Sequence, residues 1–288
     1  MDEPLDAILS RLATLLGPVD GVPVALTGGI TNRNYRVRFG AFDTVVRLCG
    51  KDTGALGIDR ETEAIATARA ASLGIGPAVL ARLAQDGVLV CAFLPGATVP
   101  VDTILAPLAQ AIRAFHDSGP LPSAFDVFAL IERAPVDTEM RSIAWRIAAA
   151  VRADGLAACH NDLLAANVLS HPSVGVRIVD WEYAGMNHRC FDLGNLVANN
   201  GLDEAATERL LAAYFSHGVS DRDRAVVALM CFVSDLREAV WGQTQRDLSE
   251  LDFDYTAYAD AHFVRAHARA TDPRLEDWLA CAAGSARP

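Results

Sequence analysis

The local character of the sequence changes near residue 95, and this change limits the folds open to the chain. Before it, short runs rich in β-branched and aromatic residues alternate with turn residues, and one helical segment, residues 59–73, follows the third run. Beyond it, the apolar periodicity is mainly helical. We therefore expect an α+β protein, with a small antiparallel sheet and one helix over residues 1–95 and a larger, mainly helical part over residues 96–288. The expected strands are residues 22–26, 35–39, 44–48, 78–83 and 88–93, and the expected helices of the second part are residues 103–117, 136–153, 204–217, 222–245 and 255–270.

The composition excludes several classes of protein. Of the 288 residues, 51% are apolar, which is enough for a substantial core. A net charge of −11 repels a phosphate backbone, so we expect no nucleic-acid partner. The longest apolar run, residues 225–233, is far shorter than the roughly 20 residues that span a bilayer, so we expect no membrane insertion. The six cysteines include no C-x-x-C pair and the N-terminus lacks a basic, apolar leader, which predicts a cytoplasmic protein with reduced thiols; the pattern predicts no oligomeric state.

A short polar segment interrupts the helical part and carries the clearest chemical signal. Residues 160–169 match the pattern H-x-D-x-x-x-x-N of kinase catalytic loops, and Asp180 ends an apolar run shortly after them. Phosphoryl transfer needs a carboxylate that faces the acceptor hydroxyl and hard oxygen ligands for magnesium. We predict Asp162 as the catalytic base and Asn167 and Asp180 as ligands of Mg²⁺, with His160 as a scaffold residue.

The N-terminal part is expected to bind the nucleotide. Thr31 and Asn32 lie in a glycine-containing turn, residues 27–35, where they can donate hydrogen bonds to phosphate; a plain hairpin turn is the alternative. Cys91 and Ala92 fall at the expected hinge between the two parts, where their backbone can bind the edge of an adenine ring.

Arg47 stands in the third expected strand, at the place where kinases carry a lysine. It can reach the nucleotide phosphates and pair with Glu63 on the following helix, although such a pair is often only structural. The chain contains a single lysine, Lys51, so an arginine at this place also fits a general bias toward arginine.

Taken together, these motifs resemble those of choline/ethanolamine kinases, which belong to the aminoglycoside-phosphotransferase-like group. The most specific match is N-H-R-C-F-D-L-G-N at residues 187–195, which is similar to the N-Y-R-x-F-D-[IL]-G-N segment of that family. The resemblance implies a two-lobe protein-kinase-like fold, ATP and Mg²⁺ as cofactors, and transfer of a phosphate to the hydroxyl of choline or a related amino alcohol such as ethanolamine. It runs from about residue 20 to about residue 265, and its other segments are residues 28–32, 45–50, 160–167 and 180–185.

The resemblance also implies a set of residues on the acceptor side. Glu182 and Asp192 match acids that shape or support the catalytic cleft, and Trp241 and Tyr255 fall on aromatic positions of the choline-binding region. An organic cation is held by aromatic faces and a nearby carboxylate. We therefore expect a small and cationic alcohol as substrate, bound by these four residues together with Glu238.

Two positions depart from the family pattern. Glu238 stands where the family often has a second tryptophan, and Asn199 stands where an acid is expected. Glu238 either supplies an anionic partner for the substrate or is a solvated helix residue. Alternatives are therefore a kinase of the same fold for an aminoglycoside, thiamine or a sugar-like alcohol, or a kinase-like binding module without catalysis. The presence of Asp162, Asn167 and Asp180 together disfavours the binding module.

Overall fold

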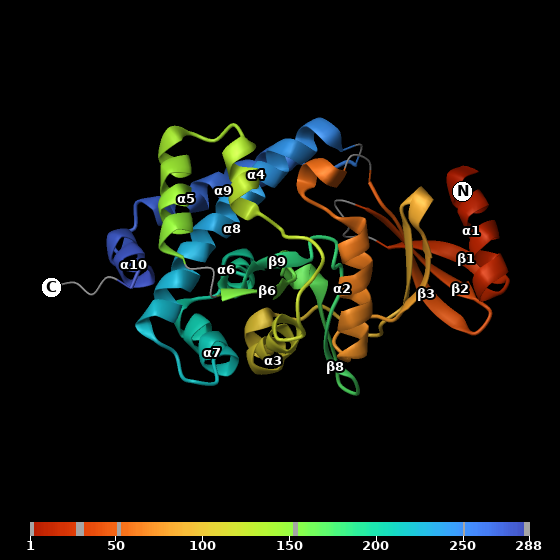
Figure 1. Cartoon of the computed structure of the whole chain (residues 1–288). Coiled ribbons are helices and arrows are strands. Elements are labelled where there is room, and N and C mark those ends of the chain that lie inside the picture. Colours follow the sequence, from red (N-terminus) through yellow and green to blue (C-terminus); the bar gives the residue numbers. More distant parts are fainter. Residues whose placement is uncertain (1–2, 27–31, 51–52, 152–154, 250, 285–288) are drawn as a thin grey trace.

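The computed structural model describes residues 3–26, 32–50, 53–151, 155–249 and 251–284. Figure 1 shows a small part built around a β-sheet beside a larger part made mainly of helices, with helix α2 (Arg60–Ser72) at their junction. This arrangement confirms the expected α+β class. We propose residue 95 as the boundary between the two parts, because the last strand of the sheet ends at Ala92.

Within the described ranges, the small part contains a five-stranded antiparallel sheet with the order β1-β2-β3-β5-β4. Helix α1 (Glu3–Leu16) covers this sheet through Leu5, Leu9 and Leu12, which are buried against residues such as Val46 and Val90. The sequence analysis did not include α1, although the spacing of these leucines is helical. The strands are β1 (Val19–Leu26), β2 (Arg33–Phe39), β3 (Phe42–Leu48), β4 (Val79–Leu83) and β5 (Val88–Ala92), with short 3-10 turns at Thr53–Leu56 and Ala84–Asp86.

The larger part is organised around α8 (Asp221–Leu248), a helix of 28 residues that is buried along most of its length. Its start is capped by Ser220, which forms a capping box with Asp223. None of the helices in the described ranges, α8 included, combines the length and the apolar character needed to cross a bilayer. The other helices are α3 (Leu105–His116), α4 (Val127–Arg133), α5 (Thr138–Ala150), α6 (Arg189–Asn199), α7 (Glu204–Tyr214), α9 (Tyr255–Ala270) and α10 (Leu275–Ala282).

Two short strand pairs in the larger part hold the polar segment that the sequence singled out. Strand β6 (Leu156–Cys159) pairs with β9 (Gly185–His188), and β7 (Val168–His171) pairs with β8 (Gly175–Ile178). The loop between β6 and β7 therefore begins and ends on hydrogen-bonded strands, which gives it a defined position. This loop contains His160 to Asn167.

The contact between α6 and α8 depends on a residue without a side chain. A Cβ atom at Gly194 would lie 2.7 Å from both the carbonyl carbon and the Cβ of Met230. Such a distance is shorter than any real contact, so only glycine lets the two helices approach this closely. Gly194 belongs to the segment 187–195 that carries the family resemblance, and its place in the fold explains that glycine.

Substitution of Gly194 by alanine is expected to lower the free energy of unfolding by about 1–3 kcal/mol, because the methyl group must push α6 away from α8. Chemical denaturation measures this change. Gly54→Ala is a matched control, since a Cβ at Gly54 meets nothing within 4 Å. Equal stability of the two variants would contradict the proposed close packing.

Candidate active site

The loop between β6 and β7 is held by a network of side chains that starts at Asn161. This residue has a φ angle of 67°, a left-handed conformation that asparagine tolerates better than most residues. Its Nδ2 donates to the carbonyl oxygen of Tyr183 at 2.9 Å, and its Oδ1 accepts from Asn187 Nδ2 at 2.8 Å. The turn that precedes Asp162 is therefore tied to the segment before α6.

Asp162 contacts one amide and one guanidinium. Asn167 Nδ2 donates to the carbonyl oxygen of Asp162 at 2.9 Å and to its Oδ2 at 3.2 Å, and Arg237 Nη1 donates to Oδ1 at 3.1 Å. Burial raises the pKa of Asp162 to about 8, although the guanidinium of Arg237 opposes this rise. The pKa of this carboxyl group thus lies close to neutral pH, which suits a group that exchanges a proton.

His160 behaves as a scaffold residue in this loop. Its Nδ1 accepts from the backbone N–H of Asp162 at 3.2 Å, and its Nε2 donates to the carbonyl oxygen of Val179 at 3.0 Å. Burial lowers the pKa of His160 and favours the neutral ring that these two bonds require. The ring therefore connects Asp162 to the residue that precedes Asp180.

Asp180 is joined to the small part by a chain of ion pairs. Arg47 Nη1 donates to Asp180 Oδ1 at 2.7 Å, and Arg47 also forms an ion pair with Glu63 on α2. Glu63 in turn pairs with Arg60 at 2.8 Å. The pairing of Arg47 with Glu63 that the sequence suggested is present, and Arg47 links it to Asp180.

Asn167 and Asp180 fit a magnesium ion. Both residues line the same cavity. Asn167 uses its Nδ2 for Asp162, which leaves its Oδ1 as a neutral oxygen donor, and the side chain of Asp180 remains 29% exposed. A carboxylate and an amide oxygen form the kind of hard donor set that Mg²⁺ prefers, and water completes such a shell.

That cavity has a volume of about 630 Å³ and lies between the sheet and the catalytic segment. Apolar side chains from β3, β5 and β7 form much of its wall, and Arg47, Asn167 and Asp180 add polar groups. The size and the mixed lining are typical of a site for a nucleotide. Other lining residues include Val45, Leu89, Cys91, Ala92, Phe93, Leu94, Leu169 and Val179.

The hinge residues differ in whether their backbone N–H groups already donate a hydrogen bond. Cys91 and Ala92 line the cavity as expected, but the N–H of Ala92 donates to Ala78 and the N–H of Phe93 donates to Asp43, each at 2.8 Å. Among the residues that the structure describes, the N–H of Leu94 has no such partner. The backbone contact of the hinge with an adenine ring stays a prediction: the N–H of Ala92 is already bonded to Ala78, and that of Leu94 is the available donor.

The structure places Asn32 against Glu182 instead of leaving it open to a phosphate. Asn32 Nδ2 donates to Glu182 Oε2 at 2.8 Å, and Arg60 Nη1 donates to the same oxygen at 3.3 Å. Asn32 is 5% exposed and Glu182 is 2% exposed, so both are structural links between the two parts of the molecule. This corrects the expected phosphate contact of Asn32 and the expected substrate contact of Glu182. Thr31, the other predicted phosphate-binding residue of the turn, lies outside the described residues.

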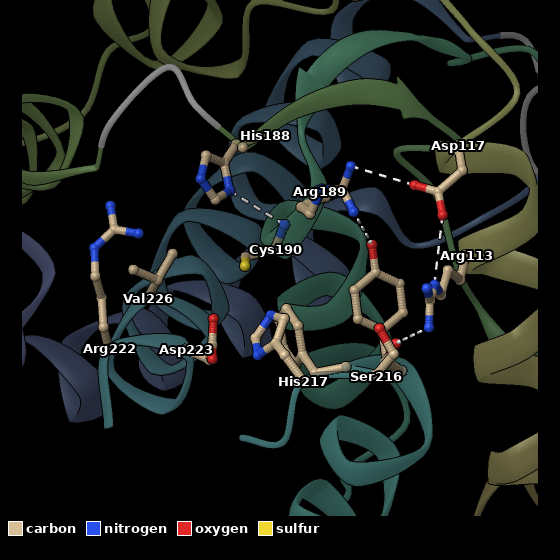
Figure 2. Close-up of a pocket in the computed structure, with 13 residues that line it drawn as sticks. Arg113, Asp117, His188, Arg189, Cys190, Ser216, His217, Arg222, Asp223 and Val226 are labelled. Carbon is tan, nitrogen blue, oxygen red and sulfur yellow. Dashed lines mark hydrogen bonds and ion pairs between the residues drawn. The ribbon is translucent and has the colours of Figure 1, made fainter. Parts of the chain in front are cut away.

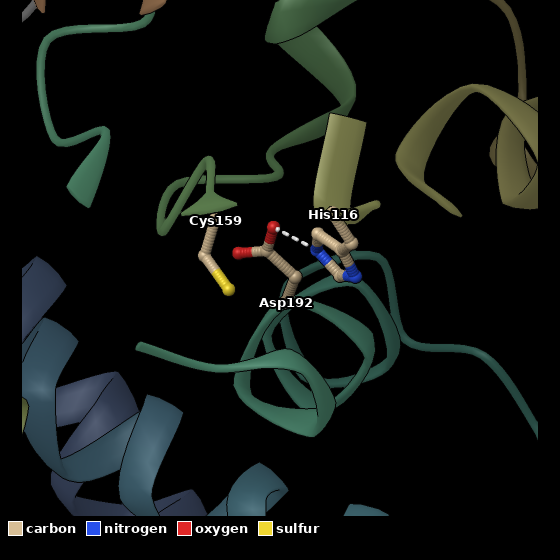
Figure 3. Close-up of side chains that lie close together, drawn as sticks. All are labelled: His116, Cys159 and Asp192. Atoms are coloured by element: carbon tan, nitrogen blue, oxygen red, sulfur yellow. Dashed lines mark hydrogen bonds and ion pairs between the residues drawn. The ribbon is translucent and has the colours of Figure 1, made fainter. Parts of the chain in front are cut away.

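Asp192 holds the loop that contains Asp162 in place through hydrogen bonds, and Figure 3 shows its contact with His116. Its Oδ1 accepts the backbone N–H of Asn161 at 2.7 Å, and its Oδ2 accepts that of His160 at 2.8 Å and His116 Nε2 at 2.9 Å. Burial raises its pKa, but the hydrogen bonds and charges of His116 and His160 together outweigh burial and leave the pKa below its usual range. Both oxygens of this 1% exposed carboxylate are used, which corrects the expected substrate contact of Asp192.

Cys159 lies beside this pair, and the three side chains form a compact group (Figure 3). Burial raises the pKa of the Cys159 thiol well above its ordinary value, so the sulfur stays protonated. A protonated thiol is a poor metal ligand, and the carboxylate of Asp192 is already engaged. The group is therefore explained as a support of the loop.

The predicted aromatic residues of the acceptor side form a buried cluster. Trp241 Nε1 donates to Tyr183 Oη at 2.7 Å, and the Trp241 ring meets the rings of Tyr255 and Tyr258 at centroid distances of 5.8 Å and 5.4 Å. Trp241 is 7% exposed and Tyr255 is 5% exposed. The sequence analysis missed the part that Tyr183 plays in this cluster.

Glu238 belongs to the same cluster and is not a solvated helix residue. Its Oε1 accepts from Arg237 Nη1 at 2.7 Å and from Asn199 Nδ2 at 3.2 Å, and its Oε2 accepts from Tyr258 Oη at 2.9 Å. The two departures from the family pattern, Glu238 and Asn199, are thus bonded to each other. Arg237 is a further residue that the sequence analysis missed, because its importance depends on partners as distant in sequence as Asp162.

A second cavity, of about 350 Å³, lies at the start of α6, where His188, Arg189 and Cys190 line it (Figure 2). Arg113, Arg189 and Arg222 contribute to its lining, and Figure 2 shows Arg113 and Arg189 directed at Asp117. Of the described residues that line it, none belongs to the predicted site. The candidate active site is therefore the first cavity together with the loop that contains Asp162.

Comparison with known proteins shows the family of the chain. The model of the phosphotransferase enzyme family matches residues 23–229, which is well over half of the chain. The chain belongs to this family. Its resemblance to choline/ethanolamine kinases and its kinase-like fold are confirmed by individual relatives.

A crystal structure of a choline/ethanolamine kinase family protein from Mesorhizobium loti is 28% identical, covers 97% of this chain and 99% of that one, and superposes with a TM-score of 0.77. Protein LicA of Haemophilus influenzae is 25% identical over 67% of this chain and 62% of LicA. Human ethanolamine kinase 2 is 32% identical over 36% of this chain and 32% of that enzyme. The chain thus spans less than two thirds of the length of these two curated relatives.

The role of Asp192 can be tested by Asp192→Asn. The amide accepts at one atom only and turns an NH₂ group toward a backbone N–H, so the free energy of unfolding should fall by about 3 kcal/mol. Any turnover should fall as well, because the loop that carries Asp162 loses its support. Urea denaturation measures the first effect, and Asp117→Asn, at a half-exposed carboxylate, is the control. A variant as stable as the control would refute this role.

Proposed function

We propose that the protein transfers the γ-phosphate of ATP, with Mg²⁺, to the hydroxyl of a small alcohol, and that the first candidates are amino alcohols of the choline and ethanolamine type. The observation that carries this proposal is the continuous set of contacts from Glu63 through Arg47 to Asp180, and from Asn167 to Asp162, beside a cavity of about 630 Å³. The family membership and the named relatives support it.

The proposed mechanism assigns one step to each part of this set. Asp162 accepts a hydrogen bond from the acceptor hydroxyl and takes its proton as the new O–P bond forms and the bond to the leaving ADP breaks. Asn167 and Asp180 hold Mg²⁺, which neutralises charge on the phosphate oxygens when it is bound. Arg47, held by Glu63, orients the phosphates, since a guanidinium can grip them at two points.

The hinge completes the nucleotide site in this proposal. Cys91 and Ala92 supply apolar surface for the adenine ring, and the N–H of Leu94 supplies a hydrogen-bond donor for its edge. Residues of β5 and β7 would hold the ring, and Arg47, Asn167 and Asp180 would bind the phosphates and the metal ion.

A second candidate is a kinase of the same fold for a less cationic alcohol, such as a sugar-like compound. One observation favours it: the carboxylate of Glu238 is already paired with Arg237 and is not open to a cationic substrate. The phosphoryl-transfer residues are the same in both candidates.

Asp162→Asn tests the proposed base. Turnover should fall about 10²–10⁴-fold, because an amide cannot take the proton of the acceptor hydroxyl. Binding of Mg-ATP should change little, since Asp162 is not among the residues that line the nucleotide cavity. An ADP-release assay and calorimetry measure the two effects, with the exposed Asp247→Asn as control. Turnover close to that of the control would disprove the assignment.

Asp180→Asn tests the proposed metal site. Loss of the anionic ligand should raise the Mg²⁺ concentration needed for half-maximal ATP affinity by about tenfold or more. Calorimetric titration of ATP at a series of Mg²⁺ concentrations measures this without turnover. Asp43→Asn is a suitable control, because Asp43 also pairs with an arginine but lies outside the cavity. An unchanged Mg²⁺ dependence would argue against Asp180 as a ligand.

A further inference from the structure

Arg237 on α8 is a buried cation in the acceptor region. It is 3% exposed, and its Nη1 lies 3.1 Å from Asp162 Oδ1 and 2.7 Å from Glu238 Oε1. Its guanidinium carbon lies 4.4 Å from the ring centroid of Tyr183 and 5.5 Å from that of Phe125. Two carboxylates and two aromatic rings are the surroundings that bind an organic cation. Here the chain itself supplies that cation.

The partners of Arg237 hold it firmly in this place. Glu238 is bonded through both oxygens, to Arg237 and Asn199 on one side and to Tyr258 on the other. Tyr183, whose ring lies against the guanidinium, is held by Trp241. A substrate cation would therefore have to displace a buried ion pair before it could reach Glu238 or the ring of Tyr183, and removing one member of such a pair is costly.

The other terminal nitrogen of the guanidinium, Nη2, provides a second observation. Nη2 of Arg237 is buried and has no hydrogen-bond partner in the described part of the chain. A buried donor without a partner is unfavourable, so a bound molecule that supplies an oxygen at this place gains affinity. Nη2 shares its carbon with Nη1, which touches Asp162. The donor without a partner therefore belongs to the same guanidinium group that contacts the proposed base.

We propose that Arg237 determines the acceptor specificity of the site: it occupies the cation position between Asp162, Glu238 and Tyr183, and it donates through Nη2 to a second oxygen of the acceptor. This inference rests on the proposed function. The preferred acceptors are small alcohols with a second oxygen near the reacting hydroxyl. A quaternary ammonium alcohol is disfavoured, because Arg237 already fills the cation position, and three N-methyl groups need more room there and cannot donate the hydrogen bonds that a primary ammonium gives to nearby oxygens.

The first test compares three acceptors with the wild-type protein in an ADP-release assay. Choline and ethanolamine differ in the three methyl groups, and ethanolamine and 2-amino-1,3-propanediol differ in one hydroxymethyl group. We expect kcat/KM to rise about tenfold at each step from choline to ethanolamine to the diol, which is the effect of about one charge-assisted hydrogen bond or one unfavourable contact. A wild-type protein that uses choline best would overturn the proposal without any variant.

The second test uses Arg237→Ala, with Arg237→Lys as a conservative variant and Arg146→Met at an exposed ion pair as control. The alanine variant should lose the preference for the diol over ethanolamine and gain at least about tenfold in the ratio of choline to ethanolamine. The lysine variant should keep the discrimination against choline, because its ammonium group still occupies the position that the N-methyl groups would need. If all acceptors fall by one common factor, Arg237 only orients Asp162 and the proposal is wrong.

A binding measurement separates this inference from the proposed function. Tetramethylammonium carries the cation of choline without a hydroxyl, and its binding needs no turnover. Calorimetry should show binding at least about tenfold tighter in Arg237→Ala than in the wild type, because the vacated position then accepts an external cation. Equal binding would overturn the inference. Absence of ADP release with every alcohol, together with tighter tetramethylammonium binding in the variant, would overturn the proposed function alone.

Discussion

The position of the catalytic loop depends on one buried carboxylate, that of Asp192. Its two oxygens accept the backbone N–H groups of His160 and Asn161, the two residues that precede Asp162. A buried charge is tolerated only when hydrogen bonds replace its lost hydration, and His116 supplies the third bond. Tyr214 in turn bonds the other ring nitrogen of His116 at 2.6 Å. The loop is therefore anchored to α3, α6 and α7 at the same time.

Helix α6 transmits this anchoring because its residues follow a three-residue spacing. Asp192 and Asn195 lie on one face of the helix, and Asn195 Oδ1 accepts the N–H of Leu163 at 2.5 Å. The loop is thus held on both sides of Asp162 by a single rigid helix. Gly194 lets that helix approach α8, the helix that carries Arg237 and Glu238. One segment, residues 187–195, therefore sets the position of the proposed base, Asp162, relative to the residues proposed to bind the acceptor.

The sequence predicted the five strands of the small part and the helices α3, α5, α7, α8 and α9, because these elements rest on local patterns. The roles of the residues proposed for phosphoryl transfer stay a prediction. The sequence analysis missed α1, whose leucines have helical spacing but precede the first strong motif, and it also missed α4, α6 and α10. It also predicted that Glu182 and Asp192 bind the substrate, because the sequence does not show that other residues of the chain already bind these two acids. Those partners, Asn32 and Arg60 for Glu182 and His116 for Asp192, are distant in the sequence or lie on other elements. The fold determines which side chain neutralises a given charge, and the spacing of residues in the sequence does not predict it.

Arg237 is a residue whose importance could not be predicted from the sequence. In the sequence it is one of many arginines, and its neighbour Glu238 attracts attention as a departure from a family pattern. In the fold the two residues and Asn199 form one unit, because Asn199 and Arg237 both donate to Glu238 Oε1. A neutral amide in place of an acid at residue 199 avoids a second carboxylate beside Glu238, which would repel it in this buried place. The two departures therefore support a single internal ion pair, and their common effect is to replace an external cation with one from the chain.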